Sequence, residues 1–151
     1  MIRGLVISQS FDSINVDASG VTMAGNFIGM QADGTSPMPN GNFGGINLRF
    51  SNAIVGGAGA GEPNTIAFNN GPGIWARLNA NSNALVRNVI YANTMQGITL
   101  QDAFPAIPLP NDAGDVDTAP GSQASRSYRI EFYANAACGS TGYGQGQTAG
   151  T

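Results

Sequence analysis

The sequence contains no lysine and no histidine, and all six of its basic residues are arginine. Without histidine, the chain lacks the commonest general base and the commonest zinc ligand. The formal net charge is −3, which argues against nucleic acid and anionic membranes as partners, because phosphate binding requires clustered positive charge. These absences exclude much of enzyme chemistry and most modes of nucleic-acid recognition.

Cysteine and long apolar runs are equally scarce. Cys138 is the only cysteine, so it cannot form an intramolecular disulfide, and a free thiol and an intermolecular bridge both stay open. No run of about 18 apolar residues exists, and the apolar stretch within residues 1–12 is too short for a secretory signal. We therefore expect neither a membrane span nor a signal peptide in this chain.

Glycine and hydrophobic residues dominate what is present. The chain has 22 glycines, 8 prolines and only 10% charged residues, and 42% of its 151 residues are hydrophobic. No long amphipathic helix pattern occurs, and a composition rich in turn-forming residues favours β-structure. The length allows one domain with a modest core.

Two short strand motifs recur along the chain, one beginning with Gly-Ile and the other entered through Asn-x-Ile. The Gly-Ile strands begin at Gly45, Gly73 and Gly97. The Asn-x-Ile strands begin at Asn26, Asn64 and Asn88. A third apolar run lies between them, at 53–55 and 84–86. Three short strands in a repeat of 24 residues predict a three-sided solenoid whose coils stack about 4.8 Å apart.

The first interval between Asn-x-Ile strands is 38 residues, whereas the second is 24. We assign the excess to one surface loop over residues 30–44, which is rich in turn-forming residues. An earlier coil is indicated by the apolar stretches 2–7 and 13–16.

Alternation along the Gly-Ile strands predicts which side chains face the core. The predicted inward positions are Ile46, Leu48, Phe50, Ile74, Ala76, Leu78, Ile98 and Leu100. The predicted outward positions are Asn47, Arg49, Trp75, Arg77 and Thr99. At one corner we expect Asn26, Asn64 and Asn88 to stack as a ladder, with amide hydrogen bonds between coils and to turn backbone.

The repeats resemble those of right-handed parallel β-helix proteins of the pectin-lyase-like superfamily, of the bacterial extracellular type. The resemblance lies in residues 25–41, 52–75 and 88–100, which look like its repeat units. It implies an extracellular or cell-surface parent protein. It implies little about activity, because the superfamily includes lyases, hydrolases, epimerases, tail-spike proteins and adhesins.

We therefore predict an all-β chain in which residues 1–101 form a right-handed parallel β-helix of three to four coils. A Pro/Gly/Asp-rich linker or cap follows over 102–127, and a single strand with a Gly-rich tail over 128–151. Because the sequence begins within what looks like a strand, we expect the first coil to lack a preceding cap and to have open strand edges. We expect a homo-oligomer to cover these edges, or the C-terminal strand to cover one end.

The outward face of the Gly-Ile sheet is the strongest candidate site, because related β-helices bind saccharides across that face. The coil alignment places Asn15, Asn47, Trp75 and Thr99 in one row. It places Asp17, Arg49, Arg77 and Gln101 in the next row. A tryptophan offers an apolar face to a sugar ring, while arginine and asparagine donate to hydroxyls or uronate carboxylates. The substrate-binding candidates are Asp17, Asn47, Arg49, Trp75 and Arg77; the alternative is a solvated face with an Asp17–Arg49 pair of little value.

No catalytic residue is assigned. Glycoside hydrolysis requires two carboxylates about 5–10 Å apart, and these rows contain only Asp17. Elimination by Arg49 or Arg77 as base would need a carboxylate cluster to hold calcium, which the face lacks. We expect a non-catalytic structural or carbohydrate-contacting module; the alternatives are a partial or degenerate polysaccharide lyase or hydrolase, and a self-associating module.

A cluster of acidic residues lies in the predicted linker. Asp112, Asp115 and Asp117 fall within six residues around a glycine, a spacing that resembles parts of calcium-binding loops. We expect either a structural calcium ion at this cluster or an acidic linker that binds no ion.

Overall fold

The computed structural model describes residues 1–12, 14–41, 43–77, 80–100, 133–134 and 148–149. Every regular element within them is a β-strand, and twelve short strands form three parallel sheets. Sheet A contains β1 (Ile2–Arg3), β4 (Thr22–Ala24), β7 (Ile54–Gly56) and β10 (Ala84–Val86). Sheet B contains β2 (Val6–Ile7), β5 (Phe27–Ile28), β8 (Thr65–Ala67) and β11 (Val89–Tyr91). Sheet C contains β3 (Ile14–Val16), β6 (Ile46–Leu48), β9 (Ile74–Ala76) and β12 (Ile98–Leu100).

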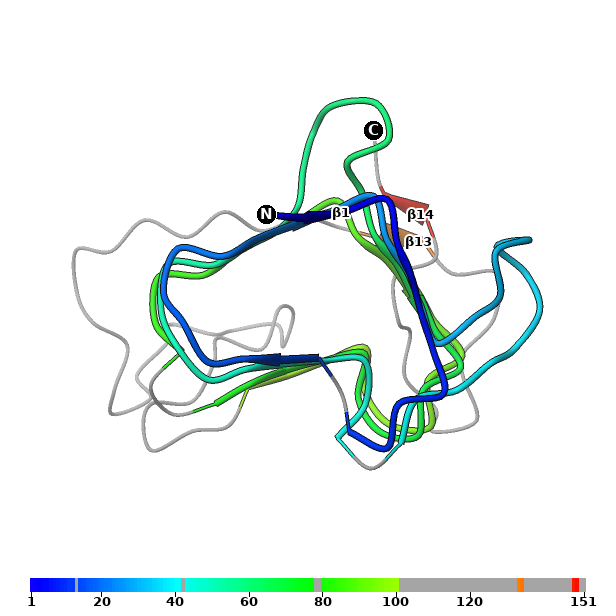
Figure 1. The fold of residues 1–151 in the computed structure, drawn as a ribbon. Helices are drawn as coiled ribbons and strands as arrows, with labels where there is room; N and C mark the ends of the chain where they lie inside the picture. Colours follow the sequence, from blue (N-terminus) through cyan, green and yellow to red (C-terminus); the bar gives the residue numbers. More distant parts are fainter. Residues whose placement is uncertain (13, 42, 78–79, 101–132, 135–147, 150–151) are drawn as a thin grey trace, which may run out of the picture.

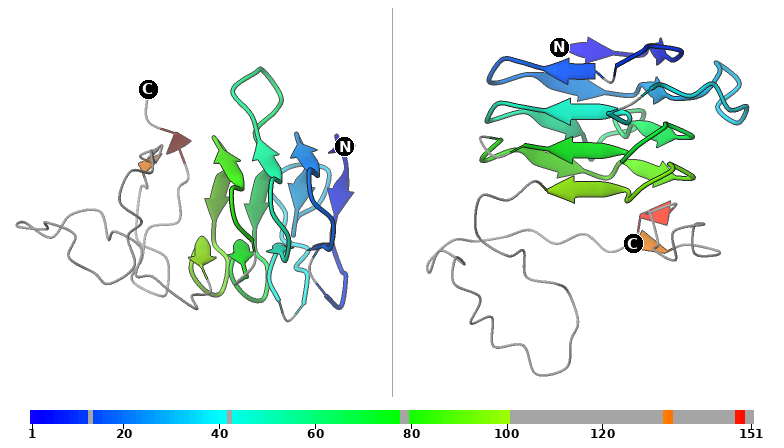
Figure 2. Two further views of the ribbon diagram at one scale, coloured as in Figure 1. Left: turned by 90° about the vertical axis from the view of Figure 1, so that its left-hand side faces the viewer. Right: turned by 90° about the horizontal axis from the view of Figure 1, so that it is seen from below.

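The strands wind into a solenoid. Neighbours within each sheet are three strands apart in the sequence, so each coil contributes one strand to each of the three sides. Figure 1 looks along the axis and shows the chain running clockwise away from the viewer, so the coil is right-handed. Figure 2 shows the coils stacked along that axis. The predicted all-β parallel β-helix is confirmed, and three full turns separate β1 from β10.

A further pair of strands, β13 (Tyr133–Ala134) and β14 (Thr148–Ala149), is antiparallel. The predicted linker over 102–127 lies outside the described residues, as does most of the predicted strand and tail over 128–151.

Strand pairing in exact register builds the core from rows of equivalent residues. Ile46 pairs with Ile14 on one side and with Ile74 on the other, and Ile74 pairs in turn with Ile98. Side chains on the inner rows fill the narrow interior. Among the described residues, the fully buried branched aliphatic side chains are Ile28, Ile46, Leu48, Val55, Ile66 and Ile74.

The alternation predicted for sheet C is correct within the central strands and fails past their ends. Ile46, Leu48, Ile74 and Ala76 are buried, as predicted. Phe50 is 47% exposed, so its predicted inward position is wrong: β6 ends at Leu48 and the chain bends at Phe50. Ile98 and Leu100 remain exposed, because β12 is the outermost strand of sheet C in the described part. Leu78 lies outside the described residues.

Two excursions, rather than one, lengthen the repeat. Residues 31–39 leave the coil after β5, and residues 57–63 leave it between β7 and β8; Figure 1 shows both outside the outline of the coils. The single loop predicted over 30–44 therefore accounts for only part of the long interval. In the first excursion, hydrogen bonds from Ser36 and Thr35 to the Asp33 carboxylate lower the pKa of Asp33 to about 2.

The predicted asparagine ladder lies at the corner between sheets A and B. The Asn26 Nδ2 atom donates to Asn64 Oδ1 at 2.8 Å, and Asn64 Nδ2 donates to Asn88 Oδ1 at 2.9 Å. Each oxygen also accepts from the backbone nitrogen of the preceding rung, at 3.0 and 3.3 Å. All three side chains are buried, so these bonds satisfy polar groups that water does not reach.

A second asparagine ladder, which was not predicted from the repeats, lies at the corner that follows sheet B. It joins Asn40 to Asn69 and Asn69 to Asn93, each through a side-chain bond of 2.9 Å. The signal was present in the last two coils, where an asparagine recurs five residues after Asn64 and after Asn88. In the earlier coil, the excursion over 31–39 displaces Asn40 along the sequence and hides the repeat.

Close stacking at these corners requires glycine at two positions. Gly29 has φ of +87° and Gly56 has φ of +88°, a region that side chains other than glycine rarely adopt. A Cβ atom on Gly29 would also collide with the Ala67 carbonyl oxygen, and one on Gly56 would lie 2.7 Å from Asn88 Oδ1. Both ladders thus depend on a glycine, which has no side chain, in the neighbouring coil.

We predict that Asn64→Asp lowers the free energy of unfolding by about 3 kcal/mol, because it places a carboxylate oxygen against two buried acceptors. Asn64 Nδ2 donates to Met23 O and to Asn88 Oδ1, both at 2.9 Å. Urea unfolding followed by circular dichroism measures the change. The exposed Asn81 provides the control, since Asn81→Asp should cost less than about 0.5 kcal/mol. Equal stability of the two variants would contradict the ladder.

Candidate functional site

The outer face of sheet C brings the predicted rows together. The pairing register places Asn15, Asn47, Trp75 and Thr99 directly opposite one another along the axis. Asp17, Arg49 and Arg77 form the adjacent row, and Arg49 forms an ion pair with Asp17 from the neighbouring coil. Gln101, the fourth predicted member of this row, lies outside the described residues.

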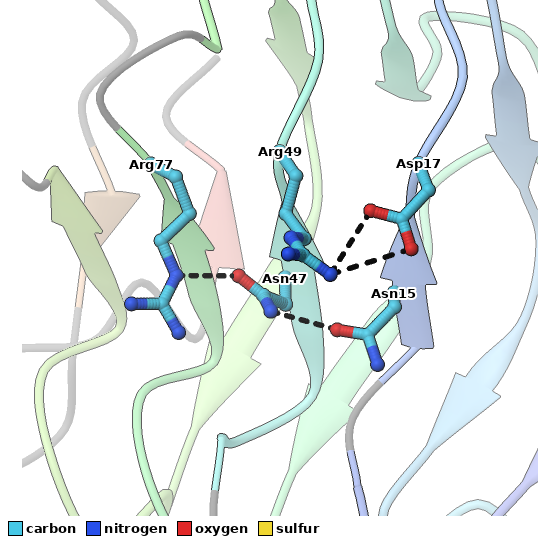
Figure 3. A network of polar contacts seen from close by, with 5 residues as sticks. All are labelled: Asn15, Asp17, Asn47, Arg49 and Arg77. Atoms are coloured by element: carbon cyan, nitrogen blue, oxygen red, sulfur yellow. Dashed lines mark hydrogen bonds and ion pairs between the residues drawn. The ribbon is translucent and has the colours of Figure 1, made fainter.

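A chain of hydrogen bonds runs across three coils of this face (Figure 3). Arg77 Nε donates to Asn47 Oδ1 at 2.8 Å, and Asn47 Nδ2 donates to Asn15 Oδ1 at 2.7 Å. Although Asn47 points outward, only 4% of it is exposed. Both polar atoms of its amide are engaged, so Asn47 fixes its two neighbours relative to each other.

The indole of Trp75 is covered by a cation. Arg77 Cζ lies 3.5 Å from the centroid of the Trp75 ring and 5.5 Å from that of the Phe43 ring. The Phe43 and Trp75 rings contact each other at 6.2 Å between centroids, with an interplanar angle of 47°. The sequence predicted an open apolar face for a sugar ring, whereas the Arg77 guanidinium occupies one face of the indole.

The charged side chains described on this face are Asp17, Arg49 and Arg77. Arg49 Nη1 lies 3.2 Å from Asp17 Oδ1, and both side chains are 53% exposed, so solvent screens the pair and limits it to at most about 1 kcal/mol. Partial burial lowers the pKa of Arg77, and the positive charge of Arg49 lowers it further. The described side chains of the two rows thus carry two positive charges and one negative charge.

Exposed phenylalanine side chains, which were not among the predicted site residues, lie near the polar rows. Phe11 and Phe43 each lie three residues before a paired isoleucine of sheet C, although the Phe11 backbone lies against Gly41 of the next coil. Phe11 is 80% exposed. Phe50, on the opposite border, follows the end of β6. Their equal spacing before Ile14 and Ile46 is the signal that would have identified Phe11 and Phe43.

The predicted calcium ligands Asp112, Asp115 and Asp117 lie outside the described residues, as does Cys138. Within the described part of the chain, no three histidine, cysteine, aspartate or glutamate side chains gather in a way that could hold a metal ion. Structural calcium at the aspartate cluster therefore stays a prediction.

Comparison with other proteins gives no relative: no protein family, no curated protein and no solved structure matches this chain. The described residues contain no helix that is long and apolar enough to cross a membrane.

We predict that Arg77→Ala makes Trp75 more accessible to a neutral quencher, because the guanidinium no longer covers the ring. Trp75 is the only tryptophan of the chain, so acrylamide quenching of the fluorescence reports on this residue alone. Arg49→Ala is the matched control, since Arg49 pairs with Asp17, and it should leave the quenching constant unchanged. If Arg77→Ala and the unaltered protein quench equally, the stack does not exist in solution.

Proposed function

We propose that the chain is a non-catalytic β-solenoid module that contacts polysaccharide through the outer face of sheet C, within a secreted or surface protein of a bacterium. One observation carries the proposal: fixed hydrogen-bonding groups on three adjacent strands lie beside exposed aromatic rings. Polar groups in planar arrays bind sugar hydroxyls and carboxylates, while aromatic rings pack against apolar sugar faces.

The geometry of the face favours an elongated ligand that runs along the solenoid axis. Equivalent side chains repeat from coil to coil, as in the row of Asn15, Asn47 and Trp75, with a spacing of about 4.8 Å. Phe43, whose ring contacts Trp75 and is partly exposed, adds an apolar surface beside these rows. A chain of sugar units offers a repeating ligand that matches such rows.

The described rows of the face contain one carboxylate, which favours binding without catalysis over hydrolysis. Hydrolysis needs a general acid and a second carboxylate, whereas Asp17 is engaged by Arg49 at 3.2 Å. The alternative is a partial or degenerate polysaccharide lyase or hydrolase, of which the lyase would use Arg77 or Arg49 as base. Absorbance of unsaturated products during incubation with uronate polymers tests it, and we expect no increase.

We predict that the protein binds at least one polymer of a panel of immobilised plant and bacterial polysaccharides. Phe43→Ala should weaken that binding about threefold to tenfold, because an aromatic contact is worth about 0.5–1.5 kcal/mol. Ile54→Ala is the control: Ile54 is an exposed apolar residue of sheet A, away from the proposed site. Absence of binding, or equal weakening by both variants, would overturn the proposal.

A second candidate function is self-association, which the first coil favours. β1, β2 and β3 each end their sheets within the described residues, so each pairs with a neighbour on one side only. Met1, Leu5 and Val6 are exposed on the same coil. Open strand edges with apolar side chains readily pair with another chain.

We predict that light scattering coupled to size exclusion shows a mass that increases with protein concentration. Val6→Lys should shift the protein toward monomer, because a charge at a strand edge opposes edge pairing. Ile54→Lys also places a lysine at an exposed aliphatic position, in the central strand β7 of sheet A, and should have no effect. A monomer at every concentration would exclude this candidate.

A further inference from the structure

We propose that Asn70 is a site of spontaneous deamidation, and that Thr94 of the next coil controls the rate by holding the backbone nitrogen of Gly71. The site lies at the corner that follows sheet B and is independent of the proposed function. Three features support it: the Asn-Gly sequence, the contrast between Asn70 and the other asparagine that precedes a glycine, and the hydrogen bonds of the Gly71 nitrogen.

Deamidation joins the side chain of an asparagine to the backbone nitrogen of the residue that follows it. Hydroxide removes the proton from that nitrogen, which attacks the asparagine Cγ atom. The new N–Cγ bond closes a succinimide ring, and the amide nitrogen leaves as ammonia after taking a proton from water. Water then opens the ring at either carbonyl and gives aspartate or isoaspartate. A following glycine favours the attack, because it has no side chain to block the approach of its nitrogen.

The sequence contains two such pairs, Asn40-Gly41 and Asn70-Gly71, and their side chains differ sharply. Asn40 is 1% exposed; its Nδ2 atom donates to Ile7 O and its Oδ1 atom accepts from Ser10 N, both at 3.1 Å. The Asn70 side chain is exposed and has no hydrogen-bond partner within the described residues. The electrophilic carbon is therefore accessible at Asn70 and enclosed at Asn40.

The nucleophile of the Asn70 site is restrained by the next coil. Gly71 is buried, and its nitrogen donates to Thr94 Oγ1 at 2.7 Å and to Asn69 O at 3.1 Å. The Thr94 nitrogen donates to the same Asn69 oxygen at 3.0 Å. Hydroxide reaches the Gly71 proton only when the Thr94 segment moves away, so the reaction rate follows the local opening of this corner.

The product would loosen the corner. Isoaspartate adds one atom to the backbone directly before Gly71. The Gly71 backbone has no room for it: a Cβ atom there would lie 2.6 Å from Gly44 N of the preceding coil, and Gly71 O accepts from Met95 N of the next coil at 3.2 Å. Because Asn69 is a rung of the second ladder, we expect the converted protein to unfold at a lower urea concentration than the unconverted protein.

The test follows the full chain during incubation at mildly alkaline pH, with peptide mapping by mass spectrometry to measure conversion of Asn40 and of Asn70. Thr94→Val removes the Oγ1 acceptor at similar size, and Thr94→Ser keeps it. Thr22→Val is the matched control, because Thr22 is a partly exposed threonine in sheet A. The unaltered protein in urea gives the rate without the fold.

We expect Asn70 to convert faster than Asn40 in the folded protein, and more slowly than Asn70 in urea. Thr94→Val should accelerate conversion of Asn70 about threefold to tenfold, because one hydrogen bond that holds the Gly71 nitrogen is lost. Thr94→Ser and Thr22→Val should both stay within about twofold of the unaltered protein.

Four results would overturn the proposal. Conversion of Asn70 at the same rate with and without urea would show that the fold does not restrain the Gly71 nitrogen. Equal conversion of Asn40 and Asn70 in the folded protein, or no conversion of Asn70, would remove the site. Acceleration by Thr22→Val as large as that by Thr94→Val would show general loosening instead of a specific contact. The first three results need only the unaltered protein, so they hold even if Thr94→Val fails to fold.

Discussion

A buried amide side chain must have its donors and acceptor satisfied, and this requirement governs how the coils of this protein stack. The Asn64 amide is satisfied by asparagines in the coils on either side: its Oδ1 accepts from Asn26 and its Nδ2 donates to Asn88. A shift of one residue in register would separate these groups and bury them without partners, at a cost of about 1–3 kcal/mol for each. With a second ladder through Asn69 at the far end of sheet B, the register is fixed at both ends of that side.

The outer face of sheet C is a consequence of that fixed register. Side chains far apart in the sequence become neighbours only because each coil repeats the position of the one before it. Arg77 thereby meets Asn47, and Asn47 meets Asn15, in a chain of bonds that no single coil contains. The same register sets Arg49 beside Asp17 of the neighbouring coil, where the two form an ion pair. The proposed ligand chemistry thus derives from coil stacking as much as from residue type.

The repeat period was enough to predict the fold and the first ladder, because both depend on spacing along the chain. The second ladder was hidden where an excursion displaces Asn40 from its regular position. Phe50 was wrongly predicted to face inward, because the alternation of apolar and polar residues does not indicate where a strand ends. The repeat pattern could not predict side-chain contacts between coils. It predicted the row that contains Trp75, but it predicted neither the Arg77 guanidinium on the Trp75 ring nor the burial of Asn47. Such contacts depend on rotamers and on neighbouring coils, which spacing alone does not specify.

Hydrogen exchange of individual backbone amides tests the central claim most directly. The nitrogens of Asn26, Asn64 and Asn69 donate to asparagine side chains of the next coil, at 3.0, 3.3 and 3.1 Å. If amide ladders fix the register, these three amides exchange only on global unfolding and share one large opening free energy. Exchange at the rate of the excursion loop over 31–39 would show that the corners open independently of the coils, and would contradict the account.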